Sequence, residues 1–71
     1  MTVATIKALR KLNGLNQHEF AEVVGVSRAL IAIVETNKQP ISFRLERKIK
    51  ESFGESQVAV VQLTMKAIEV K

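Results

Sequence analysis

Few residues of this sequence could carry catalytic chemistry. His18 is the only histidine and the chain has no cysteine, so neither a nucleophilic dyad nor a zinc site can be built from these residue types. The seven carboxylates are scattered among basic residues, as is typical of charged helix surfaces, and there is no glycine-rich phosphate loop. We therefore expect a protein that is not an enzyme and that uses no metal and no cofactor.

The remaining chemistry is that of a basic surface. The sequence has 11 Lys and Arg against 7 Asp and Glu, which gives a formal net charge of +4. A basic surface attracts polyanions, nucleic acid first, although the same charge also keeps small domains soluble. No apolar run is long enough to span a membrane, and the first residues lack a secretory apolar core. We expect one cytoplasmic domain over residues 1–71, without membrane contact.

Side chains that can cap a helix stand before four amphipathic segments. The caps are Thr2, Asn16, Ser27 and Ser42, and the segments run to about Leu12, from Gln17 to Val24, from Arg28 to Glu35 and from Phe43 to Ser52. Glu19 would complete a capping box with Asn16, and Gly25, Asn37 and Gly54 suit the turns that follow three of the segments. The stripes expected to face the core include Val3, Ile6, Leu9 and Leu12 in the first segment and Phe43, Leu45 and Ile49 in the fourth.

The stretch from Gln17 to Glu35 has the spacing of a helix-turn-helix. Its apolar positions fall at i, i+3 and i+4 in two short helices, and Gly25 can take a positive φ between them. Ala21 is small enough for the second helix to approach closely. In this motif the second helix can lie in the DNA major groove. An ordinary helical hairpin in an all-α core is the alternative interpretation of the same pattern.

The segment after Gly54 fits two kinds of structure. Val58, Val61, Met65 and Ile68 fall on a heptad-like seam, which indicates a helix over residues 56–71 with Ser56 as its cap. Alternating positions and frequent β-branched residues favour a strand instead. We favour the helix, because no other strand is indicated. Since the segment is too apolar to be left in water, it must complete the core, meet a second copy of the chain, or do both. We expect these four residues to mediate dimerisation.

Several of these positions together resemble a known family. They are Arg10, Leu15-Asn16-Gln17, Glu19, Ala21, Val24-Gly25-Val26-Ser27, Ile31 and Glu35, within a match that covers about Ile6 to Gly54. In these residues the chain resembles the phage repressor and Cro group of helix-turn-helix regulators. The resemblance implies an all-α, five-helix lambda-repressor-like domain with the motif at its second and third helices. Residues 2–54 would hold the first four helices and residues 56–71 the fifth. It also implies a homodimer that binds a two-fold-related operator on double-stranded DNA and acts as a transcriptional repressor.

The resemblance also implies roles for individual residues. It places phosphate contacts at Asn16, Gln17, Ser27, Asn37, Lys38 and Arg44. It implies that Arg10 and Glu35 form an ion pair that links the first helix to the end of the third. A solvated surface charge is the alternative for each charged member of these sets.

The outer face of residues 28–35 departs from the family, which usually carries polar side chains there. The positions expected to contact bases are Arg28, Ala29, Ala32 and Ile33. Only Arg28 can make a bidentate hydrogen bond, most naturally to guanine, while Ala29 and Ile33 could pack on thymine methyl groups. In one interpretation this face reads DNA with one arginine, methyl contacts and phosphate binding. In the other it docks on another repressor protein, and the chain is an antirepressor.

Overall fold

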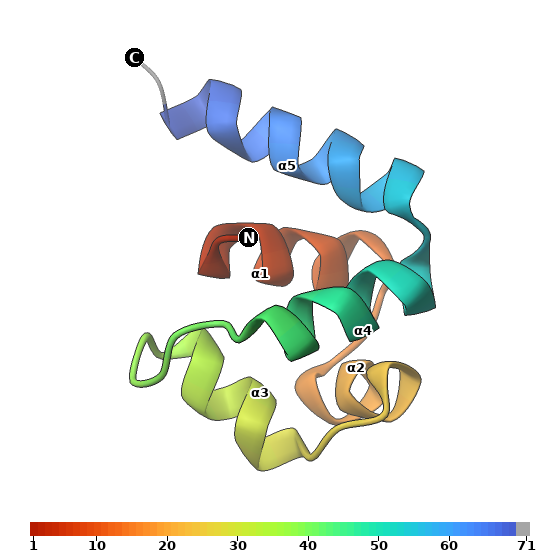
Figure 1. Ribbon diagram of the computed structural model, residues 1–71, viewed down its shortest axis with the longest axis vertical. Coiled ribbons are helices and arrows are strands. Elements are labelled where there is room, and N and C mark those ends of the chain that lie inside the picture. The colour runs from red at the N-terminus through yellow and green to blue at the C-terminus, as the bar shows by residue number, and fades with distance from the viewer. Residues whose placement is uncertain (70–71) are drawn as a thin grey trace.

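The computed structural model describes residues 1–69, and within that range it has five helices and no strand (Figure 1). The helices are α1 (Val3–Leu12), α2 (Gln17–Val24), α3 (Arg28–Glu35), α4 (Phe43–Phe53) and α5 (Glu55–Glu69). Figure 1 shows α5 at one end of the long axis, α2 and α3 at the other, and α1 and α4 between them. The expected all-α architecture is confirmed. Residues 70–71 of the expected last helix lie outside the described residues.

The first four helices begin at the predicted caps. The side chains of Thr2, Ser27 and Ser42 each accept a hydrogen bond from the backbone N–H three residues later. Asn16 and Glu19 form the reciprocal capping box, with bonds of 2.7 and 2.9 Å. Each bond satisfies a backbone donor that has no partner inside its helix. These helix starts are therefore specified by local sequence.

The fifth helix begins one residue earlier than expected, so Ser56 is not its cap. Gly54 ends α4 with a φ of +87°, and its carbonyl oxygen accepts the first helical hydrogen bond, from the N–H of Val58. The same glycine therefore ends one helix and starts the next. The ambiguity in the tail is resolved as well, because residues 55–69 form a helix rather than a strand.

The core is formed by apolar side chains from all five helices. Its buried members are Ile6, Leu9, Phe20, Ala21, Val24, Ile31, Val34, Leu45, Ile49, Val58 and Val61. Phe20 of α2 stacks on Phe53 at the end of α4, with ring centroids 5.3 Å apart. This contact joins the helix-turn-helix to the α1–α4 layer. No helix of the described part of the chain is both long and apolar enough to cross a membrane.

Two residues expected in the core are instead exposed. Leu12 is 66% exposed and Phe43 is 80% exposed. Residues three apart fall short of a full helical turn. After two such steps, from Ile6 to Leu12, the two side chains lie about 120° apart around α1. Phe43 precedes Leu45 by two residues, which places it on nearly the opposite side of α4 from that core residue.

The seam on α5 faces the protein's own core. Val58 and Val61 are buried against the α1–α4 layer and Met65 packs on the same cluster, whereas Ile68 is exposed. Val58 and Val61 therefore complete the core of the single chain, and dimerisation through the seam stays a prediction. The heptad pattern identified residues that share one helix face, and the monomer itself covers most of that face.

Candidate nucleic-acid interface

The turn between α2 and α3 holds the two helices of the motif in a fixed arrangement. Gly25 adopts left-handed backbone with a φ of +83°, and the N–H groups of Gly25 and Val26 both donate to the carbonyl of Ala21. Ala21 is itself buried, so α3 packs closely over it. Ile31 and Val34 fix α3 in the core through one face. The other face of α3 is left toward solvent.

A buried carboxylate ties α3 to the two helices that precede it. Arg10 donates from Nε to Glu35 Oε2 at 2.9 Å and from Nη2 to Glu35 Oε1 at 3.0 Å. Gln17 Nε2 donates to the same Oε1 at 3.2 Å, and Arg10 Nη1 donates to the carbonyl of Leu15. The expected Arg10–Glu35 ion pair is thus present. It joins α1 to the end of α3 and also orients Gln17 at the start of α2.

A depression of about 510 Å³ lies beside this network. Arg10, Asn16, Gln17, His18 and Arg28 line it. The first N–H groups of α2 have no partner within the helix. The positive end of the helix dipole is at this same end of α2. The depression therefore combines the exposed guanidinium of Arg28 with the features that bind phosphate at a helix start, whereas the guanidinium of Arg10 is already paired with Glu35. The sequence pattern did not indicate that His18 lines this depression. Its position directly after Gln17 was the one signal for it.

The outer face of α3 is only partly exposed. Arg28 and Ala29 are exposed, Ala32 is half-buried and Ile33 is 40% exposed. Leu30 packs against the core, so it adds little to the outer surface. The exposed part of α3 is therefore the guanidinium of Arg28 at the start of the helix, followed by the small Ala29 and the apolar Ile33.

The turn after α3 positions Lys38. Asn37 takes left-handed backbone with a φ of +60°, its N–H donates to Val34, and the N–H of Lys38 donates to Ile33. This is the Schellman arrangement, with Asn37 in the place that glycine usually takes. Asn37 and Lys38 are exposed beyond the end of α3, and Arg44 is exposed in the first turn of α4. Ser27 accepts its capping bond through Oγ and keeps a hydroxyl hydrogen to donate.

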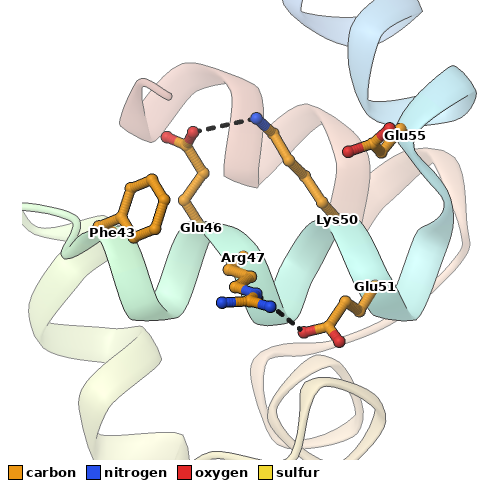
Figure 2. Close-up of a pocket in the computed structure, with 6 residues that line it drawn as sticks. All are labelled: Phe43, Glu46, Arg47, Lys50, Glu51 and Glu55. Carbon is orange, nitrogen blue, oxygen red and sulfur yellow. Dashed lines mark ion pairs between the residues drawn. The ribbon is translucent and has the colours of Figure 1, made fainter.

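The outer side of α4 forms a different kind of surface (Figure 2). A depression of about 410 Å³ is lined by Phe43, Glu46, Arg47, Lys50, Glu51 and Glu55. Lys50 pairs with Glu46 at 3.1 Å and Arg47 with Glu51 at 4.0 Å. Since three carboxylates here face two cations, this surface does not favour an anionic ligand.

Glu46 also accepts a hydrogen bond from the amino group of Met1, which donates to Oε1 at 2.8 Å. That hydrogen bond, followed by the one from Lys50, holds the pKa of Glu46 below its ordinary value. Of the basic residues of α4, Arg47 and Lys50 are paired with glutamates, whereas Lys48 and the exposed Arg44 form no ion pair within the described residues. Only Arg44 lies toward the turn that follows α3.

The fold and this face define a class of protein, the lambda-repressor-like domains with a helix-turn-helix at α2 and α3. Comparison with protein families agrees. A helix-turn-helix family model matches residues 6–58, which is most of the chain. The chain belongs to this family, the XRE-type helix-turn-helix proteins that include Cro-like and C1-like regulators, and it is a DNA-binding regulator. A search of curated proteins and a search of solved structures gave no match.

Proposed function

We propose that the chain is a sequence-specific transcriptional regulator that represses from operator DNA, with α3 in the major groove and two copies acting together. The observation that carries this proposal is the geometry of α3. One face is fixed in the core through Ile31 and Val34, while Arg28 extends from the exposed start of the helix beside the depression at α2. The N-terminal residues of such a helix are those that reach base edges.

Arg28 supplies the directional contact in this proposal. Its guanidinium can donate two hydrogen bonds to O6 and N7 of guanine. Ala29 and Ile33 supply apolar contacts suited to thymine methyl groups, and the half-buried Ala32 allows close approach of the helix to the bases. The expected operator half-site therefore contains a guanine next to positions that prefer thymine.

Phosphate contacts on both sides of α3 fix its depth and register. On one side are the start of α2, with Asn16 and Gln17, and the hydroxyl of Ser27 at the start of α3. On the other side are Asn37 and Lys38 in the turn and Arg44 at the start of α4. Gln17 is held by Glu35, so it would meet the phosphate in an orientation that is already set.

The first test is selection of random duplexes by gel shift at low salt, followed by Arg28→Ala on the selected site. We expect the variant to lose preference at one guanine, at a cost of about 1–3 kcal/mol in binding free energy. Arg47→Ala is the matched control, because Arg47 is also an exposed arginine but pairs with Glu51 on another helix. A selection that enriches no sequence would contradict the proposal.

A protein partner for the same face is the second candidate function. The observation that favours it is the shortage of hydrogen-bonding side chains on α3, where only Arg28 among the outward positions can bond a base edge. The chain would then dock on another repressor and block its DNA-binding face. Failure to enrich any duplex, together with direct binding to a purified repressor that depends on Ile33, would support this second function.

A further inference from the structure

A groove lies between the start of α1 and the second half of α5. Its volume is about 600 Å³, which is within the range of roughly 300–1,000 Å³ that small-molecule sites occupy. From α5 it is lined by Ala59, Gln62, Leu63, Met65 and Lys66, and from the start of α1 by Met1, Thr2 and Thr5. It shares no residue with the depression at α2 or with the one on α4.

The walls of this groove are mainly apolar. Ala59 and Leu63 are one turn apart on the same face of α5, and Leu63 is 68% exposed. Met1 and Met65 are partly buried and pack on the core from either side of the groove. Methionine side chains are flexible and fill irregular apolar spaces. The groove therefore offers an adaptable apolar surface to a hydrocarbon chain.

The charged groups of the groove favour an anion. No carboxylate lines it, whereas Lys66 does and forms no ion pair within the described residues. The start of α1 adds the positive end of a helix dipole, and Thr2 caps only the N–H of Thr5 among the first N–H groups of that helix. The amino group of Met1 is already bonded to Glu46. Lys66 is thus the cation that a ligand in the groove can pair with.

The topology brings the positive features to one end of the groove. Helix α5 runs back along α1, so the end of α5 lies near the start of α1 (Figure 1). Lys66 is therefore at the same end as Thr2. Ala59 precedes Lys66 by seven residues, which is about 10 Å along the helix. The groove has a positive end and an apolar length.

We propose that this groove binds an aliphatic carboxylate, with the carboxylate on the ammonium group of Lys66 and the hydrocarbon chain along Leu63 toward Ala59. The charge of Lys66 matches the head group, and such charge-assisted hydrogen bonds are the stronger ones. The apolar walls match the chain, whose burial is favourable. The exposed face of α3 is at the other end of the molecule (Figure 1), so the ligand leaves it uncovered. The inference goes beyond the proposed DNA binding and does not depend on it.

Titration calorimetry of the full chain with decanoate, kept below the concentration at which it forms micelles, tests the site without DNA. We expect saturable binding of one molecule per chain, and an unfolding temperature that rises with decanoate concentration because the ligand binds the folded chain. Decanol has the same chain without the charge and should bind at least about tenfold more weakly. Acetate has the charge without the chain and should give no measurable binding. Absence of saturable decanoate binding, or equal binding of decanol, overturns the proposal.

Two pairs of variants locate the ligand. Lys66→Met should weaken decanoate binding about tenfold, since it removes the charged partner. Lys7→Met is the matched control, because Lys7 is an exposed lysine of α1 that does not line the groove. Ala59→Phe should also weaken binding, because the larger side chain fills the apolar end, whereas Ala67→Phe changes an exposed alanine of α5 outside the groove. Circular dichroism confirms that each variant keeps its helix content. Equal effects within either pair overturn the placement of the ligand in this groove.

A competition assay relates the groove to the proposed function. Saturating decanoate should leave the affinity for a selected duplex unchanged, because the groove and α3 lie at opposite ends of the domain. Displacement of the duplex by decanoate would place the ligand at α3 and overturn the assignment to the groove. If no duplex is bound at all, the proposed function fails, while calorimetry still decides whether the groove binds decanoate.

Discussion

Glu35 is a buried carboxylate on which donors from two other helices converge. Arg10 of α1 gives it two hydrogen bonds and Gln17 of α2 gives it a third, while Glu35 itself is 4% exposed. The low polarity of the site makes each partner depend on the others, because an unpaired charge there is costly. One side chain thereby sets the position of α3 and the orientation of Gln17 together.

Loss of this carboxylate should destabilise the fold strongly. We expect Glu35→Ala to lower the free energy of unfolding by about 3 kcal/mol, because it leaves the Arg10 guanidinium without a counter-charge. A domain of this length has roughly 4–10 kcal/mol in total. Urea unfolding followed by circular dichroism measures the change. Glu22→Ala, which removes an exposed partner of His18, is the control and should stay within about 0.5 kcal/mol. Equal effects of the two substitutions would contradict this account of Glu35.

At the scale of the helices, the turn after α3 depends on one residue with left-handed backbone. Asn37 closes the Schellman arrangement at a φ of +60°, which is rare for residues other than glycine. Asparagine tolerates this backbone better than most side chains, but it does not remove the strain. The turn in turn places Lys38, so its stability bears on the proposed phosphate contact.

Substitutions at Asn37 should separate backbone strain from side-chain contacts. Asn37→Ala should destabilise the fold by about 1 kcal/mol, whereas Asn37→Gly should leave its stability unchanged or raise it slightly, because only glycine takes this φ without strain. Thermal unfolding of both variants provides the measurement, and the two substitutions at one site serve as controls for each other. A glycine variant as unstable as the alanine variant would show that the asparagine side chain matters instead.

The helices themselves were largely predictable because their signals are local. A capping side chain and the N–H that it accepts from are three residues apart, so the starts at Thr2, Asn16, Ser27 and Ser42 were visible in the sequence. The neighbours that pack on a helix face come from distant parts of the sequence, so local signals do not predict them. Phe43 carries an apolar side chain without a neighbour to cover it, and Val58 looked like an interface residue because a seam pattern does not say what packs on it.

In the candidate site, contacts between different helices were harder to predict than the helices themselves. The Arg10–Glu35 pair followed from a resemblance over many positions, since no spacing rule links residues on different helices. Leu30 lies at the flank of α3, and only the packing of the neighbouring helices decides that it belongs to the core. The contribution of His18 to the depression at α2 likewise depends on the approach of Arg28 from another helix.

For the whole molecule, the distribution of charge matters more than the net charge of +4. On the outer side of α4, Arg47 and Lys50 pair with glutamates, and Arg10 pairs with Glu35. Arg28, Lys38 and Arg44 form no ion pair within the described residues, and all three are exposed on or next to the helix-turn-helix. Other cations without an ion pair in the described residues lie on α1 (Lys7, Lys11), α4 (Lys48) and α5 (Lys66), so the three around α3 are one part of the unpaired positive charge, the part next to the helix-turn-helix.

This distribution predicts how DNA binding depends on salt. Each phosphate contact by a cation releases counterions, so the slope of log affinity against log salt concentration reports the number of such contacts. Lys38→Ala should weaken binding to all duplexes alike and reduce the slope by about 1 per copy. Lys50→Ala is the matched control, because Lys50 is already paired with Glu46 and should leave the slope unchanged. If both substitutions changed the slope equally, binding would depend on the overall charge of the chain rather than on the cations around α3.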